Sequence, residues 1–362
     1  MKHQKEYLDS LKGIAIIAVT LIHVDGRGLP GILGMIAGEG ARGVQMFFVI
    51  SAILAYDSLE RFFKQGIHLK KIGSWLLSKY FRLFPMFYLA ISISMITKSW
   101  DNYWLGSEGY VTGKNIVSHI FFLHGFFPHY TDSILGVEWY LGVLVIFYFI
   151  TPFLFCIVNS LEKAIILLLS VQLVVPWINY KISTFFPITS DGYIYNTFTY
   201  TFGPLANLYV YCLGIVLYFL LKELKNINFT ARKKRTYSYI LLLFAIIMIW
   251  GQINGNNSLF RLSHYDMFGV WFCIIIISQS LYSCCLIDNA FFRLCGKYSY
   301  GIYLFQFIAI RFYERYIHID FGNPIITKFL VTMILLVLGT HVLNILYDIP
   351  IQKKLRKLIY KQ

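Results

Sequence analysis

The chain has 362 residues, of which 57% are hydrophobic and 14% charged, and its mean hydropathy is +0.62. A soluble domain carries about 25% charged residues, so this composition argues against a water-soluble globule. The formal net charge of +14 would suggest a nucleic-acid partner in a soluble protein. Here the basic residues lie between long apolar runs, which indicates membrane topology instead.

Ten apolar runs approach or reach the length that crosses a bilayer, about 20 residues for a helix. We predict spans at about 8–24, 43–58, 76–98, 136–157, 163–180, 201–222, 237–253, 266–286, 299–317 and 324–347. The runs are continuous rather than alternating, which argues against a β-barrel. The predicted fold class is therefore an all-α polytopic membrane protein of about ten transmembrane helices.

Lys and Arg concentrate in alternate connecting segments, which places both termini in the cytoplasm by the positive-inside rule. Segment 99–135 then lies outside, and its apolar piece Ile116–Phe127 is too short to span, so we expect an interfacial or re-entrant helix there. We expect one membrane domain over 1–350 and a basic cytoplasmic tail over 351–362. The six cysteines lie in apolar runs or on the cytoplasmic side, and we expect neither disulfides nor a metal centre.

The first predicted helix carries three ionisable residues, Asp9, Lys12 and His23. Lys12 and His23 share a face and lie about 16 Å apart along the axis. Ionisable groups at membrane depth cost about 2.5–3.5 kcal/mol and usually line a pathway or a site. His23 has two interpretations, a hydrogen-bonded packing residue or, near the outward end of the helix, a neutral imidazole that takes a proton from a hydroxyl. We expect Asp9 to pair with Lys12.

The next two predicted helices carry features with two interpretations each. Lys79 and Arg82, one turn apart before Pro85, are either cytoplasmic anchors or a clamp for the phosphates of a nucleotide. Ser51 and Ala52, small residues in an aromatic stretch, either permit close helix packing or leave a slot for a thin acyl–pantetheine arm. Both alternatives remain open from the sequence.

Five motifs in order carry a family resemblance. The residues that match it are Asp9, Lys12, Gly13, Ala15 and His23; Phe47 to Leu54; Lys79, Arg82 and Pro85; Trp139, Leu141, Phe147, Tyr148 and Pro152; and Ser299, Tyr300, Tyr303 and Leu304. Over essentially its whole length the chain resembles the acyltransferase 3 family of integral-membrane enzymes. Members of that family move acetyl or related groups from cytosolic acyl-CoA to extracytoplasmic glycans.

Four positions depart from the family pattern. Lys12 stands where the family usually has Arg, which keeps the charge but loses bidentate geometry. Ala52 replaces a glycine, Leu144 replaces a glutamate found in many members, and Gln306 replaces a late histidine. Glu138 is not on the same helix face as Leu144, so it cannot be assumed to substitute for the missing glutamate.

The resemblance implies a membrane O-acyltransferase that moves an acetyl or similar short acyl group to a glycan hydroxyl. The expected roles are general base for His23, binding of acyl-CoA for Lys12, Lys79 and Arg82, and substrate or structural support for Asp9, Ser51, Glu138 and Trp139. Acetyl-CoA would be a co-substrate, with no permanently bound cofactor. The acceptor would be an extracytoplasmic or lipid-linked glycan, such as the O-antigen of lipopolysaccharide or a capsule, at a bacterial inner membrane.

Two other functions remain as alternatives. A transporter or flippase of lipid-linked sugars or acyl groups typically shows repeat symmetry and broken helices in matching halves, and the sequence shows neither. A glycan polymerase is the other, and we would expect several Arg in a large outward loop. Segment 99–135 holds Lys114 and no Arg. Both observations favour the acyltransferase.

Overall fold

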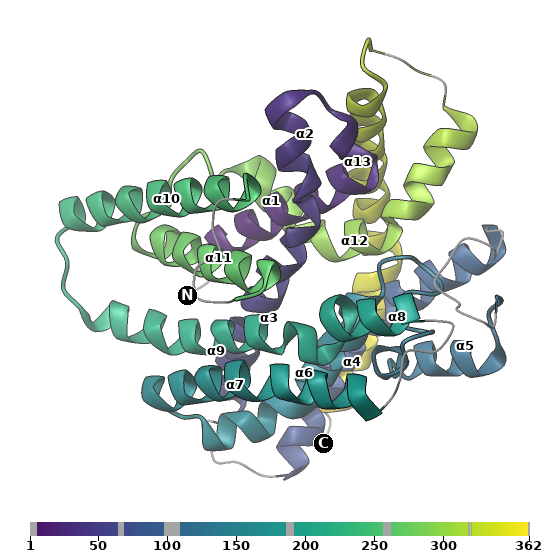
Figure 1. Ribbon diagram of the computed structural model, residues 1–362. Helices are drawn as coiled ribbons and strands as arrows, with labels where there is room; N and C mark the ends of the chain where they lie inside the picture. The colour runs from purple at the N-terminus through teal and green to yellow at the C-terminus, as the bar shows by residue number, and fades with distance from the viewer. Residues whose placement is uncertain are drawn as a thin grey trace. The chain divides into compact units, whose positions relative to one another are not determined.

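The computed structural model describes residues 6–63, 69–97, 109–185, 192–255, 262–317, 319 and 321–360, and these contain no strand. The long helices (Figure 1) are α1 (Glu6–His23), α3 (Gly43–Phe62), α4 (Leu69–Thr97), α6 (Trp139–Ile157), α7 (Leu161–Phe185), α9 (Pro204–Asn226), α10 (Ala231–Ile253), α11 (His264–Leu281), α12 (Ala290–Tyr316) and α13 (Pro324–Leu343). Each of the ten predicted spans coincides with one of them, which confirms the predicted all-helical class.

Shorter helices lie between the long ones. They are η2 (Gly26–Gly28), α2 (Gly31–Gly38), η3 (Gly40–Arg42), α5 (Gly113–Ile120), η6 (His124–Phe126), α8 (Gly192–Thr197), the π-helices η7 (Phe198–Phe202) and η9 (Asn344–Asp348), and α14 (Ile349–Tyr360). The short element expected near Ile116–Phe127 is formed by α5 and η6, neither of which is long enough to cross a bilayer. Helix α14 occupies most of the basic tail.

Eight helical segments of the described chain are both long and apolar enough to span a membrane. Helices α1 and α12 are not among them, although both were predicted as spans. The physical reason is charge, because α1 contains Glu6, Asp9 and Lys12, and α12 carries charged residues near both of its ends. The eight segments make the chain a membrane protein, and α1 and α12 direct polar groups into its interior.

The chain divides into two compact units. The first unit comprises Met1–Ile53 and Leu213–His341, and the second comprises Leu54–Cys212 and Val342–Gln362. The two units are described separately below.

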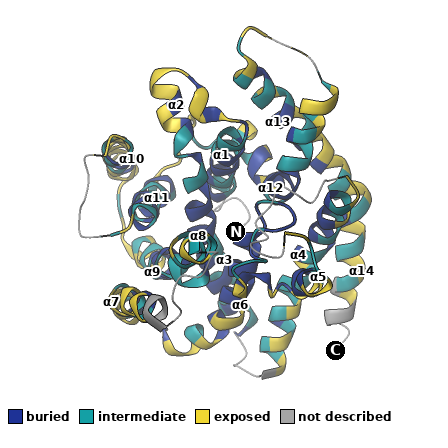
Figure 2. Ribbon diagram, turned by 45° about the vertical axis from the view of Figure 1, so that its right-hand side comes forward, coloured by how far each residue is buried: buried dark blue, intermediate teal, exposed yellow. Residues whose placement is uncertain are grey.

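In the first unit, helices α1 and α12 pack along each other and run in the same direction. Glu6 contacts Arg293 near the start of both helices, and His23 contacts Gln306 further along both. The close approach depends on two glycines, because a Cβ on Gly13 or Gly296 would overlap a backbone carbonyl of the opposite helix. In Figure 2, buried and intermediate residues predominate along α1.

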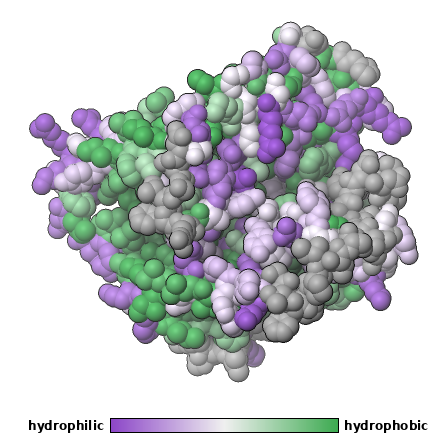
Figure 3. Space-filling model, viewed as in Figure 1, coloured by the Kyte–Doolittle hydropathy of each residue, from purple (hydrophilic) through white to green (hydrophobic). Residues whose placement is uncertain are grey.

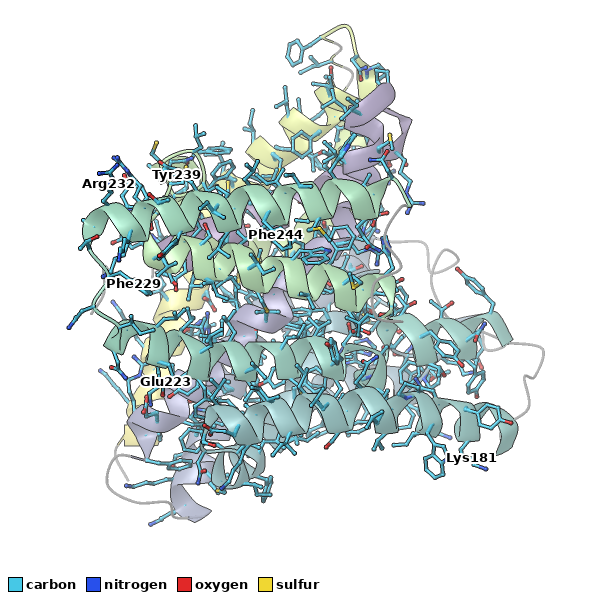
Figure 4. The ribbon with its side chains drawn as sticks, turned by 60° about the vertical axis from the view of Figure 1, so that its left-hand side comes forward. Lys181, Glu223, Phe229, Arg232, Tyr239 and Phe244 are labelled. Atoms are coloured by element: carbon cyan, nitrogen blue, oxygen red, sulfur yellow. The ribbon has the colours of Figure 1, made fainter. Side chains whose placement is uncertain are left out.

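Helix α10 of the first unit is exposed along most of its length. It starts at Ala231 and runs at once through the basic residues Arg232 to Arg235. Figure 4 shows Arg232 near this end, with Tyr239 and Phe244 further along the helix. Each of these two rings is 46% exposed. In Figure 3 hydrophilic side chains lie at the basic end and hydrophobic ones follow, as expected of a helix that leaves a charged membrane surface.

In the second unit, Trp75 of α4 lies at the centre of a cluster with Ala55, Leu59 and Phe63 of the α3 segment, all of them buried. Tyr148 and Phe155 of α6 pack against this cluster. Helix α14 packs against α4. This arrangement fixes the α4 face that carries Lys79.

Candidate active site

His23 is the last residue of α1 and is half-buried. Its Nδ1 lies 2.9 Å from Oε1 of Gln306, a residue 283 positions later in the chain. Gln306 is fully buried, and its Nε2 donates to the carbonyl oxygen of Tyr303 at 3.0 Å. That second bond fixes the amide, so its oxygen faces the imidazole, and Nδ1–H of His23 is the donor.

This pairing sets the chemistry available to His23. A neutral imidazole with its proton on Nδ1 carries a lone pair on Nε2, and Nε2 makes no hydrogen bond to any residue that the structure describes. The ring also packs against Phe307, with 4.8 Å between ring centres. The result is an oriented imidazole with one nitrogen available as a base.

Charged residues surround the chain just beyond His23. Asp25 has a left-handed backbone, with a φ of 67°, and its carboxylate lies 3.0 Å from Nζ of Lys328. Lys328 of α13 also contacts Glu314 of α12 at 2.6 Å. These ion pairs tie the turn after α1 to the two helices beside it.

At the opposite end of α1, Lys12 forms an ion pair with Asp9 at 2.6 Å, as the sequence led us to expect. Nearby, Arg293 of α12 bridges Glu6 and Asp288. Burial by itself would raise the pKa of Asp288, but hydrogen bonds from Arg293 and Ser10 outweigh it and hold that pKa below its usual range. This end of the unit therefore carries paired charges.

Lys79 and Arg82 belong to the second unit. Nζ of Lys79 lies 4.8 Å from the centre of the Trp75 ring and 5.3 Å from that of Tyr148. Ser58 Oγ accepts a hydrogen bond from Nε1 of Trp75 at 3.0 Å, which holds the indole in place. Arg82, one turn on, is exposed. The amino group of Lys79 thus lies beside two aromatic rings.

The small residues of α3 have one packing role that the structure identifies. Gly214 of α9 approaches α3 so closely that a Cβ on it would lie 2.6 Å from that of Ala52 and 2.5 Å from the carbonyl oxygen of Val49. Ala52 therefore serves close helix packing. Ser51, on the neighbouring position, is half-buried.

Glu138 is fully buried in the second unit. Its carboxylate accepts hydrogen bonds from the backbone N–H groups of Ile134, Gly136 and Val137. Nε2 of His119 lies 3.4 Å from Oε1 of the same carboxylate. Glu138 therefore closes the turn that precedes α6, and this contact set supports a structural role for it.

The histidines of the α5–η6 segment are the polar feature that sequence reasoning missed. The rings of His119 and His124 stack with 4.3 Å between their centres, and both are fully buried. Nδ1–H of His119 donates to the carbonyl of Asn115, and Nε2–H of His124 to that of Glu138. Burial lowers the pKa of His124 to about 3, so this ring is neutral at pH 7. Two histidines five residues apart in a short apolar piece were the available signal.

Trp139 stacks on Phe202 of the π-helix η7, with 4.9 Å between ring centres. Nδ2 of Asn207 donates to the carbonyls of Thr201 and Gly203 and so holds the end of that π-helix. Trp139 is buried, and its observed contact is with protein.

Comparisons with known proteins agree with the motifs. The family model described as an acyltransferase domain, that of the acyltransferase 3 family, matches residues 5–346. Two curated relatives from Staphylococcus aureus, "Putative O-acetyltransferase SACOL0978" of strain COL and "Putative O-acetyltransferase SAS0844" of strain MSSA476, are each 23% identical over 353 residues, covering 89% of this chain and 53% of theirs. The chain thus spans about half the length of these relatives. No solved structure matches significantly.

Proposed function

The chain belongs to the acyltransferase 3 family, and from this premise we propose that it is a membrane O-acyltransferase. It moves an acetyl or similar short acyl group from acyl-CoA to a hydroxyl of an extracytoplasmic or lipid-linked glycan, such as an O-antigen or a capsule, at a bacterial inner membrane. The observation that carries the proposal is the hydrogen bond from His23 to Gln306, which leaves Nε2 of His23 as an oriented base.

In the proposed reaction, Nε2 of His23 takes the proton of the acceptor hydroxyl while the oxygen of that hydroxyl attacks the thioester carbonyl. The tetrahedral intermediate collapses, the C–S bond breaks, and the CoA thiolate leaves. The proton on His23 then passes to the thiolate, so that free CoA and the acyl ester are the products. Gln306 keeps Nδ1 as the donor throughout, which holds the ring in one tautomer.

The acyl-CoA donor is assigned to the basic residues at the cytoplasmic end. Lys12, Lys79 and Arg82 are proposed to bind its phosphates. The aromatic rings beside Lys79 support this role, because their contacts with Nζ hold the ammonium group in one place. The orientation follows from the positive-inside rule and from the basic start of α10.

The test is transfer of radiolabelled acetate from acetyl-CoA to surface glycan in membranes that contain the protein. Replacing His23 with Gln should lower transfer at least about 100-fold, the lower range for loss of a general base. His341→Gln is the matched control, because His341 is another histidine of the first unit, hydrogen-bonded to Tyr298. Wild-type transfer by the His23 variant would refute the proposal.

A further inference from the structure

A second polar cluster lies in the first unit at the junction of η3, α10 and α11. Oε2 of Glu39 accepts hydrogen bonds from Nε of Arg42 at 3.0 Å and from Nε2 of His264 at 2.9 Å. Nδ1 of His264 lies 2.8 Å from Nε2 of Gln252. The guanidinium of Arg42 also lies over the ring of Tyr265, at 4.0 Å from its centre. We call these five residues the η3 cluster.

The hydrogen-bond directions in the η3 cluster leave one acceptor without a donor. The amide nitrogen of Gln252 donates to Nδ1 of His264, so the ring donates to Glu39 from Nε2–H. The amide oxygen of Gln252 then has no partner in the described structure, although the residue is only 7% exposed. Buried polar atoms in proteins are nearly always paired, so this oxygen indicates a donor supplied from elsewhere.

Asp266 adds a second unsatisfied acceptor two residues beyond His264. One of its oxygens, Oδ2, accepts from Ser263 at 2.7 Å. The other, Oδ1, has no partner among the described residues, and Asp266 is 9% exposed. The start of α11 and the end of α10 therefore offer two buried oxygens with no hydrogen-bond donor among the residues that the structure describes.

The η3 cluster is held against the end of the helix that carries His23. Gly40, between Glu39 and Arg42 in the chain, packs so closely on α1 that a Cβ on it would overlap the carbonyl oxygen of Ala18 and lie 3.1 Å from Cβ of Ile22. Ile22 immediately precedes His23. Through Gly40, the segment that carries Glu39 and Arg42 therefore packs on the last turns of α1, which end at His23.

We propose that the η3 cluster, with Asp266, is the subsite for the sugar that accepts the acyl group, and that this sugar is uncharged. The inference rests on the proposed function. Hydroxyl groups supply the donors that Gln252 and Asp266 lack. Arg42 is paired with Glu39, which makes its charge less available to an anionic sugar, and the carboxylate of Asp266 repels one.

The experiment measures release of CoA thiol by the full chain in nanodiscs, with acetyl-CoA and added methyl glucoside as the acceptor. Methyl glucuronide, which differs by a carboxylate, is the charged comparison. The uncharged glycoside should stimulate thiol release and the glucuronide should not. The inference is wrong if both glycosides stimulate thiol release equally. It is also wrong if methyl glucoside gives no stimulation in membranes in which the protein acetylates the endogenous glycan.

Two variants test the unsatisfied oxygens. Asp266→Asn turns an acceptor into a donor at constant volume, and Gln252→Glu removes the amide donor that orders His264. Each should raise the KM for methyl glucoside about tenfold. Thr332→Val is the matched control. It removes a buried hydroxyl of the first unit that likewise has no partner among the described residues, and the KM of this variant should equal that of the wild type.

The outcomes separate the two proposals. If His23→Gln abolishes transfer while Asp266→Asn and Gln252→Glu keep the wild-type KM, the subsite is wrong and the proposed function stands. If His23→Gln retains transfer, the proposed function fails whatever the KM values are. Thermal unfolding of each variant shows that it is folded, and methyl glucoside should raise the melting temperature of the wild type but not of Asp266→Asn.

Discussion

Replacing Gln306 with Leu tests the orientation of His23 directly. Leu has nearly the volume of Gln but no oxygen, so Nδ1–H of His23 loses the acceptor that now lies at 2.9 Å. The imidazole then either turns away or moves its proton to Nε2, and both changes remove the base. Because Gln306 touches His23 and has no other role in the proposed reaction, the effect should appear in kcat and leave the KM for acyl-CoA unchanged.

The size of the effect follows from the geometry. A half-buried donor left without a partner costs about 1–3 kcal/mol. Since about 1.4 kcal/mol corresponds to a factor of ten in rate, kcat should fall about 5- to 150-fold. Gln306→Glu keeps an oxygen opposite Nδ1 but loses the donor to the Tyr303 carbonyl, so it should recover part of the activity that Gln306→Leu loses, which a merely space-filling role for Gln306 would not explain.

The assay is acetyl transfer at saturating acetyl-CoA, normalised to the folded fraction from thermal unfolding in detergent. Gln279→Leu is the control, because Gln279 is another buried glutamine of the first unit and accepts from the N–H of Cys284. It should lose stability but keep kcat. An unchanged kcat in folded Gln306→Leu would refute the idea that this amide orients His23.

Two further outcomes concern the second unit. Lys79→Met should raise the KM for acetyl-CoA about tenfold if Lys79 binds phosphate. Lys163→Met is the control, because Lys163 is hydrogen-bonded to Asn159, and it should leave this KM unchanged. Equal KM values for the two variants would indicate that Lys79 is a membrane anchor. Glu138→Gln should lower the free energy of unfolding by about 1–3 kcal/mol, because its amide nitrogen cannot accept from the backbone N–H groups that now donate to the carboxylate. A variant that melts at the wild-type temperature would contradict that reading of Glu138.

The ten long helices were predictable because each transmembrane helix satisfies its own backbone hydrogen bonds and is encoded by a local apolar run. Shorter helices such as α2 and α8 were not predicted, since a run of eight residues or fewer carries too little periodicity to be distinguished from a loop. Eight of the described helical segments, rather than the ten predicted spans, are apolar enough to cross a membrane, because charged residues lower the mean hydropathy of α1 and α12. The packing of α1 against α12 could not be predicted, because it depends on contacts between residues far apart in the sequence.

The site was predictable in part. His23 stood out as an ionisable residue in an apolar run, and the pair of Asp9 and Lys12 followed from helical spacing. Gln306 could be noted only as a departure from the family motif, because its contact with His23 joins positions 283 residues apart. That contact depends on the close packing of Gly13 and Gly296, which is a property of the folded pair of helices.

The glutamine at 306 also explains how a family motif can lose its late histidine and keep a base. A second histidine beside His23 would be another titratable group in a poorly solvated site, and two such groups titrate together. An amide supplies an acceptor oxygen where a histidine would supply a ring nitrogen, and it carries no charge in either protonation state of its neighbour. It therefore fixes the tautomer of His23 at a lower desolvation cost than a carboxylate would, and the replacement of the late histidine is consistent with retained general-base catalysis.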